Sequence, residues 1–179
     1  MVLLARFDLI EYDFDHDILL SVSTALDAHV ERVRQYANDE EADTWDLLHD
    51  IDNTIGLGLT AAQAYLTSVS RALRMRRTDA ISCGPEQVGG FTIAQIVNEA
   101  ANFYKHRDEW EEEAAETRRD KRTARTIKVL TAAGLELNAD YPLSGLLEKL
   151  KMTTIRDVAY ALVRWRDHLW VTTSASTCE

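Results

Sequence analysis

The sequence predicts an all-α fold, a single-domain bundle of five to seven helices with a short N-terminal arm. With 179 residues, the chain is long enough for one domain with a substantial core and short for two. Only 7 Gly and 2 Pro are present, too few to end the many strands of a sheet protein of this length. Long runs rich in Ala, Leu, Arg and Glu, which are good helix formers, separate the few loops.

Residues 1–13 are expected to form the arm, with some strand character, and the first helix is expected from Asp15 to about Tyr36. Apolar residues recur along this helix at steps of three and four, which predicts one stripe that faces the core. The predicted stripe comprises Ile18, Leu19, Val22, Leu26, His29, Val30 and Val33.

A second helical stretch is expected from Asp43 or Thr44 to about Arg76. The segment Gly56-Leu57-Gly58 lies in its middle, and each glycine costs about 1 kcal/mol relative to Ala in a helix. A kink or a break into two helices near Gly58 is therefore expected, with Thr60 as the new N-cap.

The remaining elements follow from loop and cap signals. Gly-Pro and Gly-Gly mark a main loop, a glycine ends one helix, a proline starts a short one, and a capping box opens the last. The expected elements are the loop 78–90, helices over 92–119, 120–133, 142–151 and 154–171, and a flexible tail over 172–179. The cap residues are Gly134, Pro142 and Thr154-Ile155-Arg156-Asp157, and the last helix carries an apolar stripe of Ile155, Val158, Ala159, Leu162, Trp165 and Leu169.

The helix over 92–119 contains the segment with the densest polar chemistry, Ala101-Asn102-Phe103-Tyr104-Lys105-His106-Arg107-Asp108-Glu109-Trp110. On a helical wheel its apolar arc lies opposite a polar side, with Trp110 at the edge of the arc. The polar side comprises Asn98, Asn102, Lys105, His106 and Glu109. Asparagine is mildly unfavourable inside a helix, so we interpret this side as holding a loop backbone or a ligand. A solvated helix face is the alternative.

The net charge of −10 disfavours nucleic-acid binding, because affinity for phosphates requires a basic face. Such a face would have to come from the region of Arg118 to Arg125. An acidic chain without a signal-peptide pattern or an 18-residue apolar run is expected to be cytoplasmic, without a membrane span, and able to meet a basic partner. Cys83 and Cys178 are expected to be free thiols.

Metal and cofactor patterns are weak in this sequence. Asp46-x-x-His49 occurs once, whereas a di-iron bundle needs two such motifs and two further carboxylates. Asp13-x-Asp15-x-Asp17 has the first spacings of a calcium loop but lacks its Gly and its final Glu. We therefore expect no metal and no cofactor.

The ten-residue segment from Ala101 to Trp110 resembles a motif of uncharacterised bacterial all-helical proteins of similar length, Ala-Asn-aromatic-aromatic-Lys-His-x-Asp-Glu-Trp. The resemblance covers roughly residues 91–170, including Thr126-Ile127-Lys128-Val129-Leu130 and Leu162-Val163-Arg164-Trp165-Arg166. It implies an all-α fold and no particular activity.

A more distant resemblance is to HEPN-type helical bundles, which include bacterial toxin and defence ribonucleases. That family places an Arg and a His four to six residues apart on one helix, where they cut RNA across a dimer interface. No Arg lies four to six residues before His106. The closest match to the family pattern is Arg164-Trp165-Arg166-Asp167-His168, in which only three residues separate Arg164 from His168.

Two functions from different classes follow, and a small-ligand or metal-binding bundle remains as a third class. The first is a non-enzymatic helical interaction protein with a protein partner or a second copy, an accessory or inhibitory component of a bacterial defence or toxin system. The alternative is a divergent, metal-independent ribonuclease with His106 as general acid or base and Lys105 holding phosphate. The candidate binding residues are Asn98, Asn102, Glu109, Trp110, Arg164 and His168.

Overall fold

The computed structural model describes residues 5–7, 10–36, 44–85, 87–113 and 121–176, with side chains for 13–36, 44–85, 87–107 and 121–173. Within these residues the chain forms seven helices and two short antiparallel hairpins, which confirms the predicted all-α bundle. The helices are α1 (Phe14–Tyr36), α2 (Thr44–Ala72), α3 (Arg77–Ser82), α4 (Ile93–Glu113), α5 (Lys121–Ala132), α6 (Pro142–Lys149) and α7 (Ile155–Ser176).

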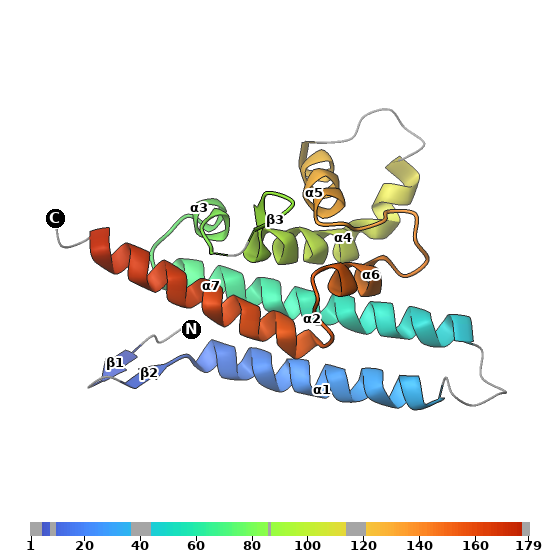
Figure 1. The fold of residues 1–179 in the computed structure, drawn as a ribbon, viewed down its shortest axis with the longest axis horizontal. Helices are drawn as coiled ribbons and strands as arrows, with labels where there is room; N and C mark the ends of the chain where they lie inside the picture. The colour runs from blue at the N-terminus through green and yellow to red at the C-terminus, as the bar shows by residue number, and fades with distance from the viewer. Residues whose placement is uncertain (1–4, 8–9, 37–43, 86, 114–120, 177–179) are drawn as a thin grey trace.

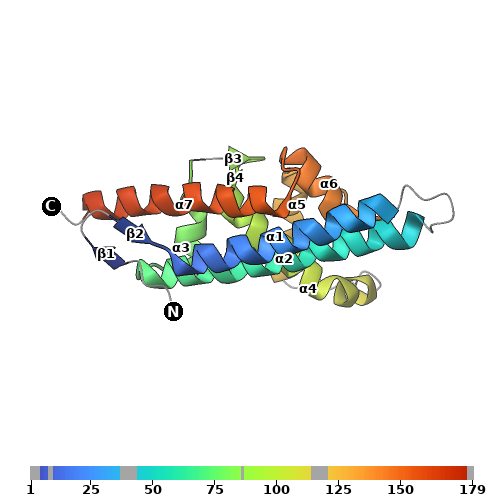
Figure 2. The same ribbon diagram turned by 90° about the horizontal axis from the view of Figure 1, so that it is seen from below.

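Helix α2 is the centre of the bundle. Helices α1 and α7 run along it, and α4 and α6 also pack against it (Figures 1 and 2). The predicted apolar stripe of α7 is buried along its length, since none of its six residues is more than 3% exposed. The apolar arc of α4 is also buried, with Ile96 and Ala100 at 0% exposure. Burial of these stripes against α2 is the main favourable contribution to folding.

Helix α2 is continuous, so the expected break near Gly58 is wrong. A side chain at Gly56 would collide with the Tyr104 ring, and one at Gly58 would collide with Ile155. The two glycines therefore allow α4 and α7 to approach α2 closely, and tertiary packing offsets their low helix propensity. The Thr60 hydroxyl donates to the Gly56 carbonyl oxygen at 3.0 Å, inside the uninterrupted helix, and does not cap a new one.

Part of the predicted loop 78–90 is ordered secondary structure. Helix α2 ends at Ala72, where Arg74 adopts the left-handed conformation (φ 55°), and α3 follows. Strands β3 (Gln87–Val88) and β4 (Phe91–Thr92) then form a hairpin with a turn at two positive-φ glycines. Helix α3 is too short to be recognised by periodicity, and it is held by Trp165, whose Nε1 donates to the Ala80 carbonyl oxygen at 3.1 Å.

The helix N-termini are capped both locally and across the chain. The Thr154–Asp157 box is confirmed, because each side chain accepts from the backbone N–H of the other residue, at 2.8 and 3.1 Å. Helix α6 has no cap from its own segment; instead the buried Asp52 of α2 accepts from the backbone N–H of Ser144 at 2.8 Å. This contact fixes α6 on the N-terminal half of α2.

The two ends of the chain differ in part from the prediction. Strands β1 (Ala5–Phe7) and β2 (Ile10–Tyr12) form a hairpin within the predicted arm. Helix α7 continues to Ser176, so the tail predicted from 172 is helical over 172–176. Cys83 is free and exposed, whereas Cys178 lies outside the described residues. No helix in the described part of the chain combines the length and apolarity needed to cross a bilayer.

Candidate functional site

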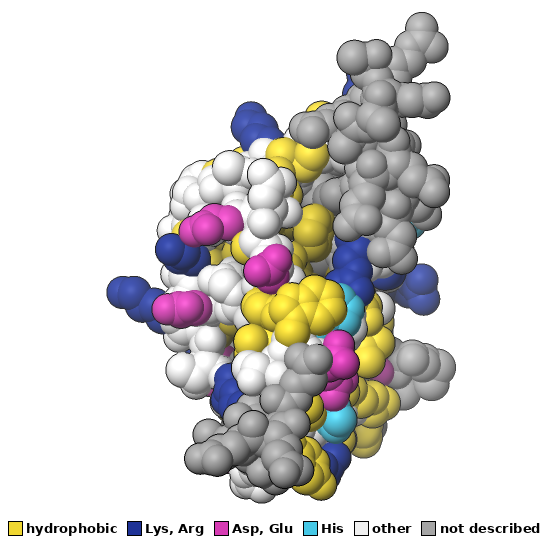
Figure 3. Space-filling model, turned by 90° about the vertical axis from the view of Figure 1, so that its right-hand side faces the viewer, with side chains coloured by type: hydrophobic (Ala, Val, Ile, Leu, Met, Phe, Trp, Pro, Cys, Tyr) yellow, Lys and Arg dark blue, Asp and Glu magenta, His cyan; other side chains and the backbone are white. Residues whose placement is uncertain are grey.

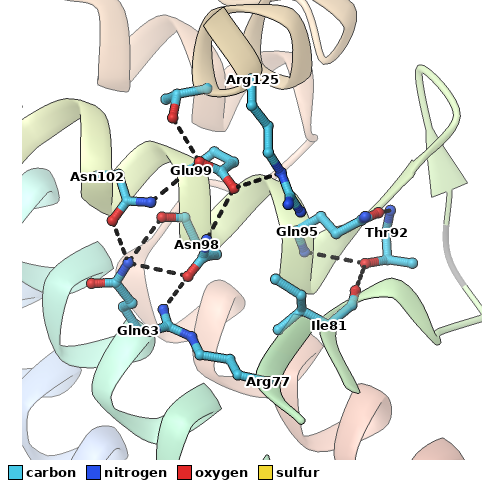
Figure 4. Close-up of polar contacts among 10 residues, drawn as sticks. Gln63, Arg77, Ile81, Thr92, Gln95, Asn98, Glu99, Asn102 and Arg125 are labelled. Carbon is cyan, nitrogen blue, oxygen red and sulfur yellow. Dashed lines mark hydrogen bonds and ion pairs between the residues drawn. The ribbon is translucent and has the colours of Figure 1, made fainter. Parts of the chain in front are cut away.

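The polar residues of α4 contact α2 through the side-chain amide of Gln63, which is 7% exposed. Its Nε2 donates to Asn98 Oδ1 at 3.2 Å and to Asn102 Oδ1 at 2.8 Å (Figure 4). Its Oε1 accepts a hydrogen bond from Lys105 Nζ at 2.6 Å. Asn102 thus contacts a side chain of a neighbouring helix, where a loop backbone or a ligand was expected.

Glu99 continues these contacts toward α5. Its carboxylate is 5% exposed and accepts from Asn98 Nδ2 at 3.1 Å and from Asn102 Nδ2 at 3.2 Å. Thr126 Oγ1 donates to Glu99 at 2.7 Å, and Arg125 Nε forms an ion pair with it at 3.5 Å (Figure 4). The buried carboxylate therefore has both hydrogen-bond donors and a cationic partner, which burial of a charge requires.

Arg77 of α3 lies beside Asn98 and donates a hydrogen bond to Asn98 Oδ1. Burial lowers the pKa of the Arg77 guanidinium, and the charge of Glu99 opposes this shift. The pKa of Lys105 is also lowered, first by burial and then by the positive charge of Arg77. The charges of the network thus act on one another: Glu99 raises the pKa of Arg77 against the effect of burial, and Arg77 lowers the pKa of Lys105.

We call these residues the α4 network. It joins four helices and comprises Gln63, Arg77, Asn98, Glu99, Asn102, Lys105, Arg125 and Thr126. All three of its side-chain amides use both their nitrogen and their oxygen within the network. The arrangement therefore acts as a cross-link between helices, although one buried atom of it, Arg77 Nε, has no hydrogen-bond partner among the described residues.

The structure brings together only some of the predicted site residues. Asn98, Asn102 and Lys105 meet in the network, but Asn98 is buried at 7% exposure, so placing it on a side opposite the core was wrong. His106 is exposed on α4. Glu109 and Trp110 belong to α4, but their side chains lie outside the described residues. On α7, Arg164 is exposed and His168 is half-buried.

Sequence reasoning missed Gln63, Arg77 and Glu99. Glu99 lies between Ile96-Val97 and Ala100-Ala101, and a carboxylate inside an apolar run indicates a buried partner. Gln63 lies in an alanine-rich stretch, Ala61-Ala62-Gln63-Ala64, where the same signal applies. No local signal could have identified Arg77, because it reaches Asn98 only through the fold of α3 against α4.

A second polar cluster fixes the N-terminus of α1. Asp13 accepts the backbone N–H of His16 at 2.9 Å, and its Oδ2 accepts from Tyr65 and Arg166, each at 2.5 Å. Burial raises the pKa of Asp13, but the hydrogen bonds from Tyr65 and Arg166 outweigh it and hold the pKa below 3.8. Asp13 is therefore an ionised N-cap that ties α1 to α2 and α7.

Metal ligation finds no support in the described part of the chain, where no three His, Cys, Asp or Glu side chains are grouped as a metal site requires.

The ring of His49 stacks on Trp45, with ring centroids 5.7 Å apart and an angle of 5° between the ring planes. Trp45 is 58% exposed. On the face of the molecule drawn in Figure 3, hydrophobic, histidine and acidic side chains lie side by side.

Helix α1 carries exposed apolar side chains at successive turns. Phe14, Ile18 and Val22 follow each other at four-residue steps and are 52%, 62% and 38% exposed; we call them the α1 stripe. All residues of the predicted apolar stripe were expected to face the core. Leu19, Val30 and Val33 are buried, whereas Ile18 and Val22 are not. Beside the stripe lies a groove of about 310 Å³ between α1 and α2, lined on the α2 side by Ala61, Ala64, Tyr65 and Ser68.

No family model matches the chain, and no curated protein or solved structure matches it either.

Proposed function

We propose that the chain is a non-enzymatic interaction protein that binds a helix of a protein partner along the α1 stripe. The observation that carries this proposal is the exposure of Ile18 at 62% in a continuous apolar line beside a groove. Large apolar side chains that are exposed singly are ordinary, whereas a contiguous stripe rimmed by polar residues marks a binding surface. An amphipathic helix is the partner element that matches a groove between two helices.

The groove favours close approach of a helix. Ala61 and Ala64 lie on its α2 side together with Tyr65 and Ser68, and the small alanine side chains leave space for apolar side chains of the partner. Asp15 lines the groove, and Asp17 beside it is 75% exposed. Together with the net charge of −10, these carboxylates favour a partner with basic residues beside its apolar face.

The hydrogen bonds within the α4 network support the non-enzymatic assignment. Lys105, one of the two residues proposed for catalysis in the ribonuclease alternative, donates to Gln63, and the amides around it bond to one another. The resemblance to HEPN-type bundles suggests a defence or toxin system as the setting of the partner.

The test compares proteins captured by wild type, by the double variant Ile18→Ser/Val22→Ser, and by Val171→Ser. Val171 is a matched control because it is 68% exposed and apolar but lies on α7, outside the stripe. We expect a partner that wild type and Val171→Ser retain and the double variant loses. Mass spectrometry of cross-linked peptides should place that partner on α1. If every captured protein binds all three baits equally, the α1 stripe is not the binding surface.

A further inference from the structure

The exposed side of α2 extends the α1 stripe into a broader surface. Leu57 is 52% exposed, and Ala64 is also exposed. At 100° per residue these two side chains lie within about 20° of each other around the helix. Ala64 also lines the groove that Ile18 and Val22 line from α1. We call the surface made of the α1 stripe, Leu57 and Ala64 the α1–α2 face.

The two ends of α2 carry opposite charges on this face. Asp46 in the first turn and Arg71 in the last turn are both exposed. Around the helix, both lie within about 40° of Leu57. They are about 38 Å apart along the axis, with Leu57 near the middle. The α2 part of the face therefore has an acidic end, an apolar middle and a basic end.

Helix α1 has the same order of charges. Asp17 in its first turn is 75% exposed, and Arg32 near its C-terminal end is also exposed. This order stabilises each helix through its dipole. It also makes two antiparallel copies of either helix complementary, because the acidic end of each copy then faces the basic end of the other. Parallel copies would instead bring like charges together.

Helices α1 and α2 lie side by side and antiparallel, so their exposed sides belong to one surface (Figure 2). His29 Nε2 lies 2.9 Å from Asp50 Oδ2 near one end of the helix pair. The Ser68 hydroxyl donates to the Asp15 carboxylate near the other end. A two-fold axis across the middle of the pair, near Leu57, places α1 on α1 and α2 on α2 of a second copy, both antiparallel. The four helices then form a bundle between the two copies.

The helix pair is large enough for a stable interface. Helices α1 and α2 have 23 and 29 residues. Two adjacent helices of these lengths present a surface of about 40 Å by 20 Å. That area is close to the about 800 Å² per partner that specific interfaces bury. A second copy therefore matches the face in size as well as in charge.

We propose that the α1–α2 face is the interface of an antiparallel homodimer of this chain, in which each copy covers the α1 stripe of the other. This inference rests on the proposed function, because it concerns the same stripe, and it adds how binding there is regulated. A protein partner must displace the second copy before its helix can occupy the groove. Binding of the partner therefore weakens as the concentration of the chain rises.

The test measures the oligomeric state of the full chain by sedimentation velocity, between about 1 and 200 µM. We expect a dimer with a Kd below about 10 µM, within the range of interfaces of this size. Asp46→Arg and Arg71→Glu should each raise this Kd about tenfold, because each substitution turns two attractive pairs of the symmetric interface into two repulsive ones. The double variant Asp46→Arg/Arg71→Glu restores both pairs and should dimerise within about threefold of wild type.

Lys128→Glu is the matched control for Arg71→Glu. It makes the same change in net charge, but Lys128 is exposed on α5, outside the face, so the dimer should persist. Asp46→Arg makes the net charge less negative, so a general repulsion between acidic chains cannot explain why it weakens the dimer. Circular dichroism checks that each variant is folded.

The dimer is overturned if wild type stays monomeric up to about 200 µM, or if the double variant dimerises no better than its single parents. Neither result affects the proposed function, since a partner can bind the α1 stripe of a monomer. Conversely, a dimer that shows the expected charge effects stands even where no other protein is captured on α1, a result that would overturn the proposed function alone.

Discussion

Glu99 is the residue on which the α4 network depends most. Every partner described for its carboxylate is a donor or a cation: two asparagine amides, the Thr126 hydroxyl and Arg125. In Glu99→Gln one oxygen becomes an NH₂ group that faces these donors, and Arg125 loses its charged partner. We expect the free energy of unfolding to fall by about 1.5 to 3 kcal/mol in urea denaturation.

The matched control for Glu99→Gln is Glu136→Gln. Glu136 also forms an ion pair, with Lys149 at 4.0 Å, but its side chain is 76% exposed. Solvent screens such a pair, so this variant should change the free energy of unfolding by no more than about 0.5 kcal/mol. Equal effects of the two substitutions would mean that the network does not stabilise the bundle.

At the residue scale, the sequence allowed the asparagines to be singled out but not their partners. Asn98 and Asn102 are noticeable because Asn is unfavourable inside a helix. Their contacts with Gln63 depend on the packing of α4 against α2, across 35 and 39 positions of the chain. Such a contact leaves no local pattern, so sequence reasoning could only leave open whether the asparagines bind a ligand or another part of the chain.

At the scale of elements, the glycines of α2 show where propensity and packing disagree. Propensity alone predicts that Gly56→Ala stabilises α2. The structure predicts the reverse, because the added Cβ would collide with the Tyr104 ring. We expect Gly56→Ala to lower the free energy of unfolding by about 1 to 3 kcal/mol, measured by urea denaturation.

Gly145→Ala in α6 is the comparison for Gly56→Ala, since nothing lies within 4 Å of its added Cβ. It should stabilise the protein by up to about 1 kcal/mol. The double variant Gly56→Ala/Tyr104→Ala should be less destabilised than the sum of its parts, because the collision partner is removed. Additive effects would show that Tyr104 is not what makes glycine necessary at position 56.

The elements that the sequence predicted correctly are those with strong local signals. The stripe of α7, its capping box, Gly134 after α5 and Pro142 at the start of α6 were all predicted and are confirmed. The α1 periodicity was read correctly as helical, but it did not show which apolar residues face inward. A stripe wide enough to include Ile18, Leu19 and Val22 covers more of the helix than α2 and α7 bury.

At the scale of the whole molecule, the charge distribution favours the proposed interaction protein over the ribonuclease alternative. Phosphate binding by Lys105 and His106 requires nearby cations, and Arg77 is the cation that shifts the pKa of Lys105. Glu99 neutralises part of that positive charge, and the net charge of −10 repels RNA. The basic groups expected to help were Arg164, His168 or the cluster from Arg118 to Arg125; of these, Arg125 is committed to Glu99.

We therefore expect purified protein to leave single-stranded RNA intact without added metal, even at high protein concentration and low salt, where electrostatic attraction is strongest. Measuring RNA length over time for wild type and His106→Ala checks this expectation, and circular dichroism confirms that the variant is folded. Cleavage at equal rates by both proteins would indicate a contaminating nuclease, because His106 is the only general acid or base in the ribonuclease alternative. Cleavage by wild type that His106→Ala lacks would establish that alternative, since an exposed imidazole beside Lys105 would then be acting on phosphate despite the acidic field of the molecule.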